Sequence, residues 1–286
     1  MVASTEYHRP TSVESACQLL SELEDPTIVA GMQSLGLLVK EGIVSPDVLV
    51  DINQVEGLAG IERDGDRLHV GATTSHRAVE TSETVAETVP VLGTAAGEIA
   101  DLQIRNAGTI GGATVYADPT GDYPPVLLAV DATLVSRSVD GEHERDAVDF
   151  FTGFYECALE PTELLTSVRL PVMDDSEGAG YEKLAYREND RSVVNVCSYV
   201  RVTDGVCEAA RIAVGSVSGK PLYAADAAET LVGTTLDGSD IEAAAETAAE
   251  EIPVDPDPTI SDDYREAMVG SLTENTLRDA REEVSE

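Results

Sequence analysis

The chain has 286 residues, which is enough for one large domain or for two to three smaller domains with cores of their own. It carries 54 acidic against 18 basic side chains, and the resulting formal net charge of −36 argues against binding to nucleic acid. With 42% hydrophobic residues and periodic segments the chain is expected to fold, so we interpret the evenly spread carboxylates as a surface adaptation of a salt-loving, halophilic host.

Cysteine usage and hydropathy bear on the compartment. The cysteines form no C-x-x-C pair and have no metal-type spacing with the histidines, so free buried thiols and no metal site are expected. They are Cys17, Cys157, Cys197 and Cys207. No signal peptide precedes the first predicted helix, and no uncharged apolar run is long enough to cross a bilayer. We therefore expect a soluble cytoplasmic protein.

The first part of the chain predicts a small α/β unit. Ser12 is a favourable N-cap for a helix over residues 13–23, and residues 34–40 predict a second helix. Short β runs at residues 27–30 and 48–51 alternate with these helices.

The middle of the chain combines a hairpin, helices and further strands. Asp64-Gly65 between two apolar runs predicts a hairpin of residues 61–63 and 67–70, and helical patterns follow at 75–80 and 91–99. The remaining predicted features are a glycine-rich stretch at 106–112, a loop ending at Pro124-Pro125, an apolar run at 126–130, and strands at 133–137 and 164–170.

The last third predicts strands followed by helices. Proline, glycine and aspartate over residues 171–180 indicate a linker, which we assign to residues 173–180. The predicted strands beyond it are 195–202 and 206–217, and the predicted helices are 224–232, 241–251 and 262–281. Because strands and helices come in uneven order without a repeat, the sequence predicts an α+β fold.

Two glycine-bearing turns are candidate anion sites. Residues 30–34 lie between a β run and a helix, and residues 108–112 form the second turn. Glycine allows consecutive backbone N–H groups to converge on an anion such as pyrophosphate. Taken alone each turn is more often structural, and neither matches the Rossmann or P-loop pattern.

The two turns, residues 30–34 and 105–112, resemble the two FAD signatures of the medium subunit of carbon monoxide dehydrogenase and its xanthine dehydrogenase relatives, the molybdenum hydroxylase family. The resemblance runs essentially from end to end. Its other motifs are residues 7–10, 71–76, 117–119 with Asp122, 151–161, 163–165, 181–183 and 209–214.

This resemblance implies an FAD-binding domain over residues 1–172, of the PCMH (vanillyl-alcohol-oxidase-like) type, with subdomains 1–55 and 56–172. A smaller α+β domain, the C-terminal flavoprotein-subunit domain, would follow over residues 181–286. The helices and strands predicted from the residues alone agree with this division.

The resemblance also implies the cofactor-binding residues. Residues 28–35 and 109–113 would wrap the FAD pyrophosphate and ribityl chain, mainly through backbone amides. Asp122 would bind polar groups of the flavin, Leu165 would pack on its ring, and Lys183 would lie near it. The full set is Ile28, Val29, Ala30, Gly31, Met32, Gln33, Ser34, Leu35, Thr109, Ile110, Gly111, Gly112, Ala113, Asp118, Asp122, Leu165 and Lys183. The plainer alternatives are solvated loop carboxylates for the two aspartates and core packing for Leu165.

Two positions depart from the family pattern. Met32 stands where the carbon monoxide dehydrogenase type has a second glycine, so left-handed geometry there would cost roughly 1 to 2 kcal/mol. Ala113 replaces a common asparagine and removes a side-chain hydrogen bond worth about 0.5 to 1.5 kcal/mol net. Both changes would loosen FAD without abolishing the site.

In the family this chain resembles, a large subunit holds the molybdenum cofactor and a small subunit holds two [2Fe-2S] clusters. This chain has no cysteine pattern for such clusters. Its implied role in a heterotrimer is to pass electrons from a partner's cluster through FAD to an external acceptor such as a quinone, NAD or oxygen. Two alternatives stay open: a non-catalytic assembly subunit that has lost FAD, and a self-standing flavin oxidase.

Overall fold

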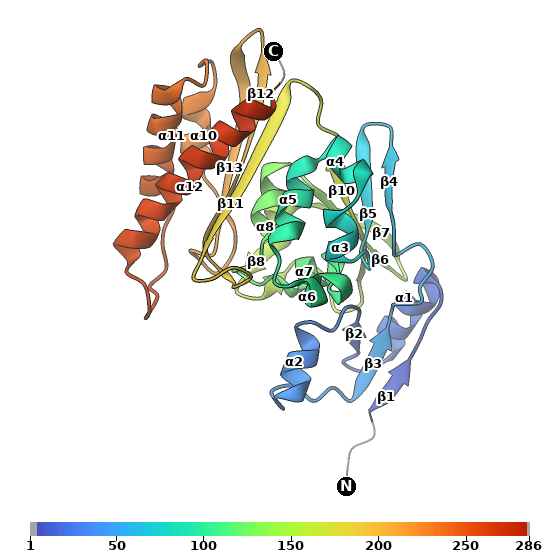
Figure 1. Ribbon diagram of the computed structural model, residues 1–286. Helices are drawn as coiled ribbons and strands as arrows, with labels where there is room; N and C mark the ends of the chain where they lie inside the picture. Colours follow the sequence, from blue (N-terminus) through green and yellow to red (C-terminus); the bar gives the residue numbers. More distant parts are fainter. Residues whose placement is uncertain (1–4, 285–286) are drawn as a thin grey trace.

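A computed structural model describes residues 5–284 and has three consecutive units, coloured from blue to red in Figure 1. The N-terminal unit, residues 5–55, holds a three-stranded parallel sheet in the order β1-β3-β2. Its elements are β1 (Glu6–His8), α1 (Val13–Glu22), β2 (Thr27–Val29), α2 (Leu35–Lys40) and β3 (Val48–Asp51). Ser12 caps α1 as predicted, since its Oγ accepts from the Ser15 N–H at 3.2 Å.

The middle unit, residues 56–172, is an antiparallel five-stranded sheet in the order β4-β5-β10-β6-β7, with helices packed over one face (Figure 1). Its strands are β4 (Ile61–Asp64), β5 (Arg67–Gly71), β6 (Thr133–Ser138), β7 (Gly141–Asp146), β8 (Phe151–Gly153), β9 (Glu156–Cys157) and β10 (Leu164–Pro171). Its helices are α3 (His76–Glu80), α4 (Glu83–Thr88), α5 (Pro90–Glu98), α6 (Leu102–Ala107), α7 (Ile110–Tyr116), α8 (Tyr123–Ala129) and α9 (Ala147–Phe150).

The C-terminal unit, residues 173–284, is an antiparallel sheet in the order β11-β12-β13-β14. Its elements are β11 (Glu177–Ala185), β12 (Ser192–Thr203), β13 (Val206–Gly215), β14 (Leu222–Tyr223), α10 (Ala225–Leu231), α11 (Gly238–Glu251) and α12 (Asp262–Glu283). Both faces of the sheet are buried. Val194 and Val196 pack toward the three helices, whereas Cys197 and Tyr199 join the core of the middle unit. The C-terminal unit is therefore fixed to the middle unit by a shared core.

The structure corrects the predicted linker over residues 173–180, because residues 177–180 are part of β11. A Cβ built on Gly178 would lie 1.9 Å from the carbonyl oxygen of Ala280, and one on Gly180 would lie 2.3 Å from that of Thr276. These glycines let α12 rest directly on β11. They are therefore packing glycines, not linker glycines.

Two further local predictions need correction. The loop predicted to end at Pro124-Pro125 ends earlier, since both prolines lie in the first turn of α8, where their missing N–H groups cost nothing. The glycine-rich stretch at 106–112 is mostly helical, because it spans the end of α6 and the start of α7.

The cysteines of the described chain are free thiols, as predicted; three are buried and Cys157 is half-buried. Among residues 5–284, none of the helices has the length and apolar character needed to span a membrane.

Candidate functional site

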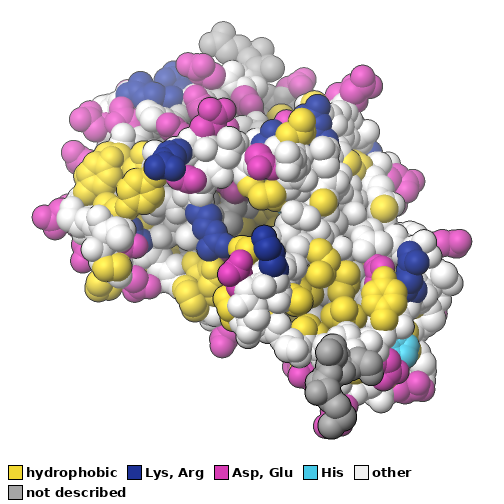
Figure 2. All heavy atoms as spheres, turned by 60° about the horizontal axis from the view of Figure 1, so that its bottom comes forward, with side chains coloured by type: hydrophobic (Ala, Val, Ile, Leu, Met, Phe, Trp, Pro, Cys, Tyr) yellow, Lys and Arg dark blue, Asp and Glu magenta, His cyan; other side chains and the backbone are white. Residues whose placement is uncertain are grey.

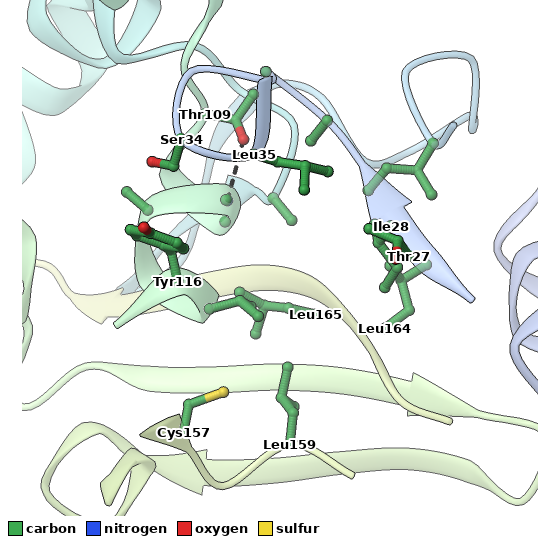
Figure 3. Close-up of a pocket in the computed structure, with 18 of the residues that line it drawn as sticks. Thr27, Ile28, Ser34, Leu35, Thr109, Tyr116, Cys157, Leu159, Leu164 and Leu165 are labelled. Atoms are coloured by element: carbon green, nitrogen blue, oxygen red, sulfur yellow. Dashed lines mark hydrogen bonds between the residues drawn. The ribbon is translucent and has the colours of Figure 1, made fainter. Parts of the chain in front are cut away.

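A pocket of about 650 Å³ lies between the N-terminal and middle units. It is bordered by the turn from β2 to α2, by α7, and by the segment from Tyr155 to Leu165. Figure 2 shows a hollow near the middle of the face that is turned forward, with hydrophobic side chains in and around it and charged side chains of both signs at its rim. Figure 3 shows side chains from β2, α7 and the 157–165 segment that meet in the same space. Its size suits a dinucleotide-sized ligand.

The pocket brings together twelve of the seventeen predicted cofactor-binding residues. Both predicted glycine turns contribute, although they are more than 70 residues apart in the sequence. The twelve are Ile28, Ala30, Gly31, Met32, Gln33, Ser34, Leu35, Thr109, Gly111, Gly112, Ala113 and Leu165. Leu165 is buried on β10 and belongs to the core of the middle unit as well. Core packing and a place in the pocket lining are therefore compatible at this position.

The first turn offers unused hydrogen-bond donors. Within residues 5–284, none of the backbone N–H groups of Gly31, Met32, Gln33, Ser34 and Leu35 donates to a protein acceptor. The Ser34 side chain makes no capping bond either, which leaves its hydroxyl free at the start of α2. Consecutive free amides of this kind can bind an anion.

Met32 supplies the backbone geometry of that turn at a cost. Its φ is +59°, in the left-handed region where a side chain costs roughly 1 to 2 kcal/mol. Position 32 therefore has the left-handed geometry in which a methionine in place of the family's glycine is unfavourable. The side chain is 37% exposed, so no tight packing offsets the strain.

The second turn is built differently, because four of its five backbone N–H groups already donate within the protein. Their role as donors to FAD stays a prediction. The N–H groups of Ile110 and Gly111 donate to the carbonyls of Thr74 and Ala72 at 3.0 and 2.9 Å. Those of Gly112 and Ala113 donate to the Oγ1 and carbonyl oxygen of Thr109.

Close approach explains the glycine at position 111. A Cβ there would lie 2.6 Å from both the Cβ and the carbonyl oxygen of Ala72. Gly111 therefore lets α7 lie against the end of β5, and the second turn acts mainly as a wall of the pocket.

Five predicted residues do not line the pocket. The side chains of Val29 and Ile110 are buried away from it, 7% and 0% exposed. Asp118 accepts from the Thr120 N–H at 2.9 Å and lies 3.6 Å from the guanidinium of Arg191. The remaining two, Asp122 and Lys183, pair with each other.

The Asp122–Lys183 pair joins the middle and C-terminal units. Lys183 Nζ lies 3.1 Å from Asp122 Oδ1, and both side chains are nearly buried. Tyr181 also donates its hydroxyl to Asp122, at 2.7 Å, and Lys183 donates to the carbonyl oxygen of Glu98. Burial raises the pKa of Asp122, and the Lys183 charge opposes that rise. Contact of either residue with the flavin stays a prediction.

The structure adds lining residues that the predicted set omits. They are His76, Tyr116, Tyr155, Cys157 and Leu159, together with several others of the 155–165 segment. Tyr116 and Tyr155 meet edge to face with centroids 4.9 Å apart. His76 is the last residue of the motif 71–76, and only its neighbours in the folded chain distinguish it from a core histidine.

The electrostatic character of the pocket follows from its lining. Among the described residues that border it, none is Lys or Arg. Burial, with a smaller effect of Arg105, lowers the pKa of His76 to about 4, so its ring is neutral at pH 7. Burial raises the pKa of Cys157, which keeps it a thiol. An anion here would thus be held by the free amides of the first turn.

Comparisons with known proteins agree with this geometry. Residues 3–173 match the family described as the FAD binding domain in molybdopterin dehydrogenase, and residues 179–280 match the CO dehydrogenase flavoprotein C-terminal domain. Subunit alpha of the 6-hydroxypseudooxynicotine dehydrogenase complex of Paenarthrobacter nicotinovorans is 35% identical over 97% of this chain and 94% of its own length. The carbon monoxide dehydrogenase medium chain of Afipia carboxidovorans is 33% identical over 97% of both chains.

A solved structure of carbon monoxide dehydrogenase from Hydrogenophaga pseudoflava superimposes with a TM-score of 0.94 at 33% identity, covering 100% of both chains. Similarity in sequence and in fold thus extends over the whole chain, including both turns of the pocket. The chain therefore belongs to the family of FAD-binding medium subunits of the molybdopterin dehydrogenases.

Proposed function

We propose that the pocket binds FAD and that this chain is the electron-transfer subunit of a molybdenum hydroxylase complex of the carbon monoxide, aldehyde or xanthine dehydrogenase type. The observation that carries the proposal is the turn of residues 31–35, whose consecutive backbone N–H groups are free and border a largely apolar pocket of about 650 Å³. Such a site suits a ligand with a negatively charged centre and a flat aromatic ring.

The residues of the pocket fit the parts of FAD. The pyrophosphate would lie on the amides of residues 31–35 and beside the Ser34 hydroxyl, with Thr109 as a second polar contact. Leu165 and Leu159 offer apolar surface for the ring. We keep Asp118, Asp122 and Lys183 as proposed contacts at the edge of the middle unit, where the C-terminal unit covers it.

Bound FAD would supply the exchange between single-electron transfer from a partner's cluster and paired-electron transfer to an external acceptor. The chain would bind and orient the cofactor and tune its surroundings. The carboxyl groups in its lining are those of Glu160 and Glu163, and Glu163 is paired with Arg145 at 2.9 Å. This distribution supports an electron carrier more than a self-standing oxidase.

The proposed partners are a large subunit with the molybdenum cofactor and a small subunit with [2Fe-2S] clusters, together forming a heterotrimer. Exposed apolar side chains beside the pocket support the proposal that a partner subunit covers this surface. Helix α2 buries none of its residues, and Leu37 and Ile43 are 53% and 70% exposed. We propose that the small subunit covers this helix.

We further propose a cytoplasmic location in a halophilic host. Free thiols suit a reducing compartment, and the net charge of −36 suits concentrated salt. The domain division proposed is 1–172 for the FAD-binding domain, with subdomains 1–55 and 56–172, and 181–286 for the C-terminal domain. The strand β11 replaces part of the linker between them.

A second candidate function is an assembly subunit that has lost FAD, and the observation that favours it is the methionine at position 32, where the family pattern has a glycine. The two functions differ in cofactor content. The test is an absorption spectrum of the chain purified in high salt, followed by titration with FAD and chemical reduction. The electron-transfer subunit is expected to bind FAD and to show a flavin spectrum that bleaches on reduction. No binding by the folded chain, even with its partner subunits, would favour the assembly subunit.

A further inference from the structure

His76 packs against Gly108, in the second turn of the pocket. It is the first residue of α3 and is 4% exposed, yet part of it borders the pocket. Its backbone N–H donates to the carbonyl oxygen of Gly108 at 3.0 Å. Its ring lies directly against the same residue, since a Cβ built on Gly108 would be 2.7 Å from Nε2. One edge of the imidazole is thus fixed beside Gly108.

The opposite edge of the ring is held by Tyr123. Nδ1 lies 3.2 Å from the Tyr123 hydroxyl, and Tyr123 is 1% exposed. Within residues 5–284 this hydroxyl has no other hydrogen-bond partner. Burial raises the pKa of Tyr123 well above its usual value, so the phenol keeps its proton. A buried hydroxyl with one nitrogen partner is satisfied by donating to it, which makes Nδ1 the acceptor.

The ring proton of neutral His76 must then be on Nε2. Within the described residues Nε2 has no hydrogen-bond partner, and it faces Gly108 at the edge of the pocket. The nearby charges are Arg105 on α6 and Glu80 on α3, which pair with each other at 3.1 Å. A neutral N–H donor is therefore available in a lining without Lys or Arg.

We infer that His76 is a further cofactor-binding residue, in which Tyr123 fixes the Nε2–H form of the ring and this N–H donates to the phosphate-bearing part of the bound dinucleotide. The assignment rests on the proposed FAD site. It gives the second turn a donor of its own, although the amides of residues 110–113 are engaged within the protein. Tyr123 acts as a positioning residue because it reaches the ligand only through His76.

The tautomer is measured first, in the wild-type chain without ligand, by long-range ¹H–¹⁵N correlation spectra. The chain has only four histidines, and His76→Gln assigns the signal. We expect a proton on Nε2 and an acceptor-type Nδ1, and we expect the Nε2–H signal to move when FAD is added. A proton on Nδ1, or an Nε2–H signal unchanged at FAD saturation, overturns the inference.

Titration with FAD and with riboflavin, which lacks phosphate, supplies the second readout. Tyr123→Phe removes one oxygen and is expected to raise the Kd for FAD by about three- to tenfold. His76→Phe is expected to raise it further, whereas His76→Gln retains a donor and is expected to lie between wild type and His76→Phe. Riboflavin binding is expected to change less than twofold in Tyr123→Phe.

Equal losses of affinity for FAD and for riboflavin would mean that His76 and Tyr123 only shape the pocket, and would overturn the assignment. Unchanged FAD affinity in both His76→Phe and Tyr123→Phe would do the same. If the wild-type chain binds no FAD, the proposed function itself fails, and this outcome is separate because the wild-type titration precedes the variants.

Discussion

Gly31 and Ala107 are in backbone contact, so the two glycine turns of the pocket touch each other. A Cβ built on Gly31 would lie 2.3 Å from the carbonyl oxygen of Ala107 and 2.7 Å from the Cα of Gly108. Neither atom belongs to a flexible side chain, so a Cβ would force the turns apart. The N-terminal and middle units therefore close around the pocket only if position 31 is glycine.

Gly31→Ala is accordingly expected to raise the Kd for FAD at least tenfold and to lower the free energy of unfolding by about 1 to 3 kcal/mol. The matched control is Gly36→Ala, where the added Cβ would meet the Met32 Cβ at an ordinary 3.6 Å. The control lies inside α2 and is expected to be neutral or slightly stabilising. Fluorescence titration and urea unfolding measure both. Equal behaviour of the two variants would contradict the contact.

Met32→Gly separates the two proposed functions. Because the turn holds φ at +59° without ligand, glycine is expected to raise the free energy of unfolding by about 0.5 to 1 kcal/mol, after the larger entropy of the unfolded glycine is counted. The Kd for FAD is expected to change less than threefold, since the strain exists before and after binding.

Met32→Ala is the control for this change, because it shortens the side chain but keeps the strained backbone, and we expect no gain in stability from it. A gain of tenfold or more in FAD affinity for Met32→Gly would show instead that methionine impairs the site. That outcome would favour the assembly subunit.

Features of the chain that depend on local pattern could be predicted from the sequence. The turn after β2, Ser12 as a helix cap and the Asp64-Gly65 hairpin are encoded by neighbouring residues, and the structure has them at those positions. Hydrogen-bond partners that lie far apart in the sequence cannot be predicted from neighbouring residues. The carbonyls that engage the amides of Ile110 and Gly111 belong to residues more than 35 positions earlier. The sequence therefore gave no reason to treat the second turn as already satisfied.

The same limit explains the misread linker and the unrecognised role of His76. Glycines at 178 and 180 look like linker residues until α12, about 100 residues later, is placed on them. His76 and Tyr123 are 47 residues apart, and no spacing rule connects them. Packing between units, rather than local propensity, decides these positions.

The Asp122–Lys183 pair is expected to stabilise the junction of the middle and C-terminal units. Lys183→Met leaves a buried carboxylate without its cation, which costs about 3 to 5 kcal/mol in comparable buried pairs. Asp122→Asn/Lys183→Met removes both charges and is expected to be more stable than Lys183→Met alone. Lys220→Met, at an exposed lysine, is the control and is expected to change stability by less than about 0.5 kcal/mol. Urea unfolding of wild type, Asp122→Asn, Lys183→Met and the double variant measures the coupling, and strictly additive losses would contradict a direct pair.

His76 makes the stability of the chain depend on pH below 7. Burial lowers its pKa to about 4 in the folded chain, whereas the unfolded residue titrates near 6.5. Between these values the unfolded chain binds the proton and the folded chain does not, so stability is lost as the pH falls from about 6.5 to about 4. Buried Asp122 acts in the opposite direction because its pKa is raised. The contribution of His76 is therefore isolated by comparison with a variant.

The difference in free energy of unfolding between wild type and His76→Gln is expected to shrink by about 2 to 3 kcal/mol between pH 7 and pH 4.5. The measurement is urea unfolding at fixed high salt, so that screening of the net charge stays constant. His69→Gln, which removes a half-buried imidazole from β5 in the same unit, is the matched control. A difference that stays constant over this range would mean that His76 already accepts a proton in the folded chain near pH 6. The Nε2–H ring would then be a cation at the edge of the pocket, and phosphate binding would owe more to charge than to a neutral hydrogen bond.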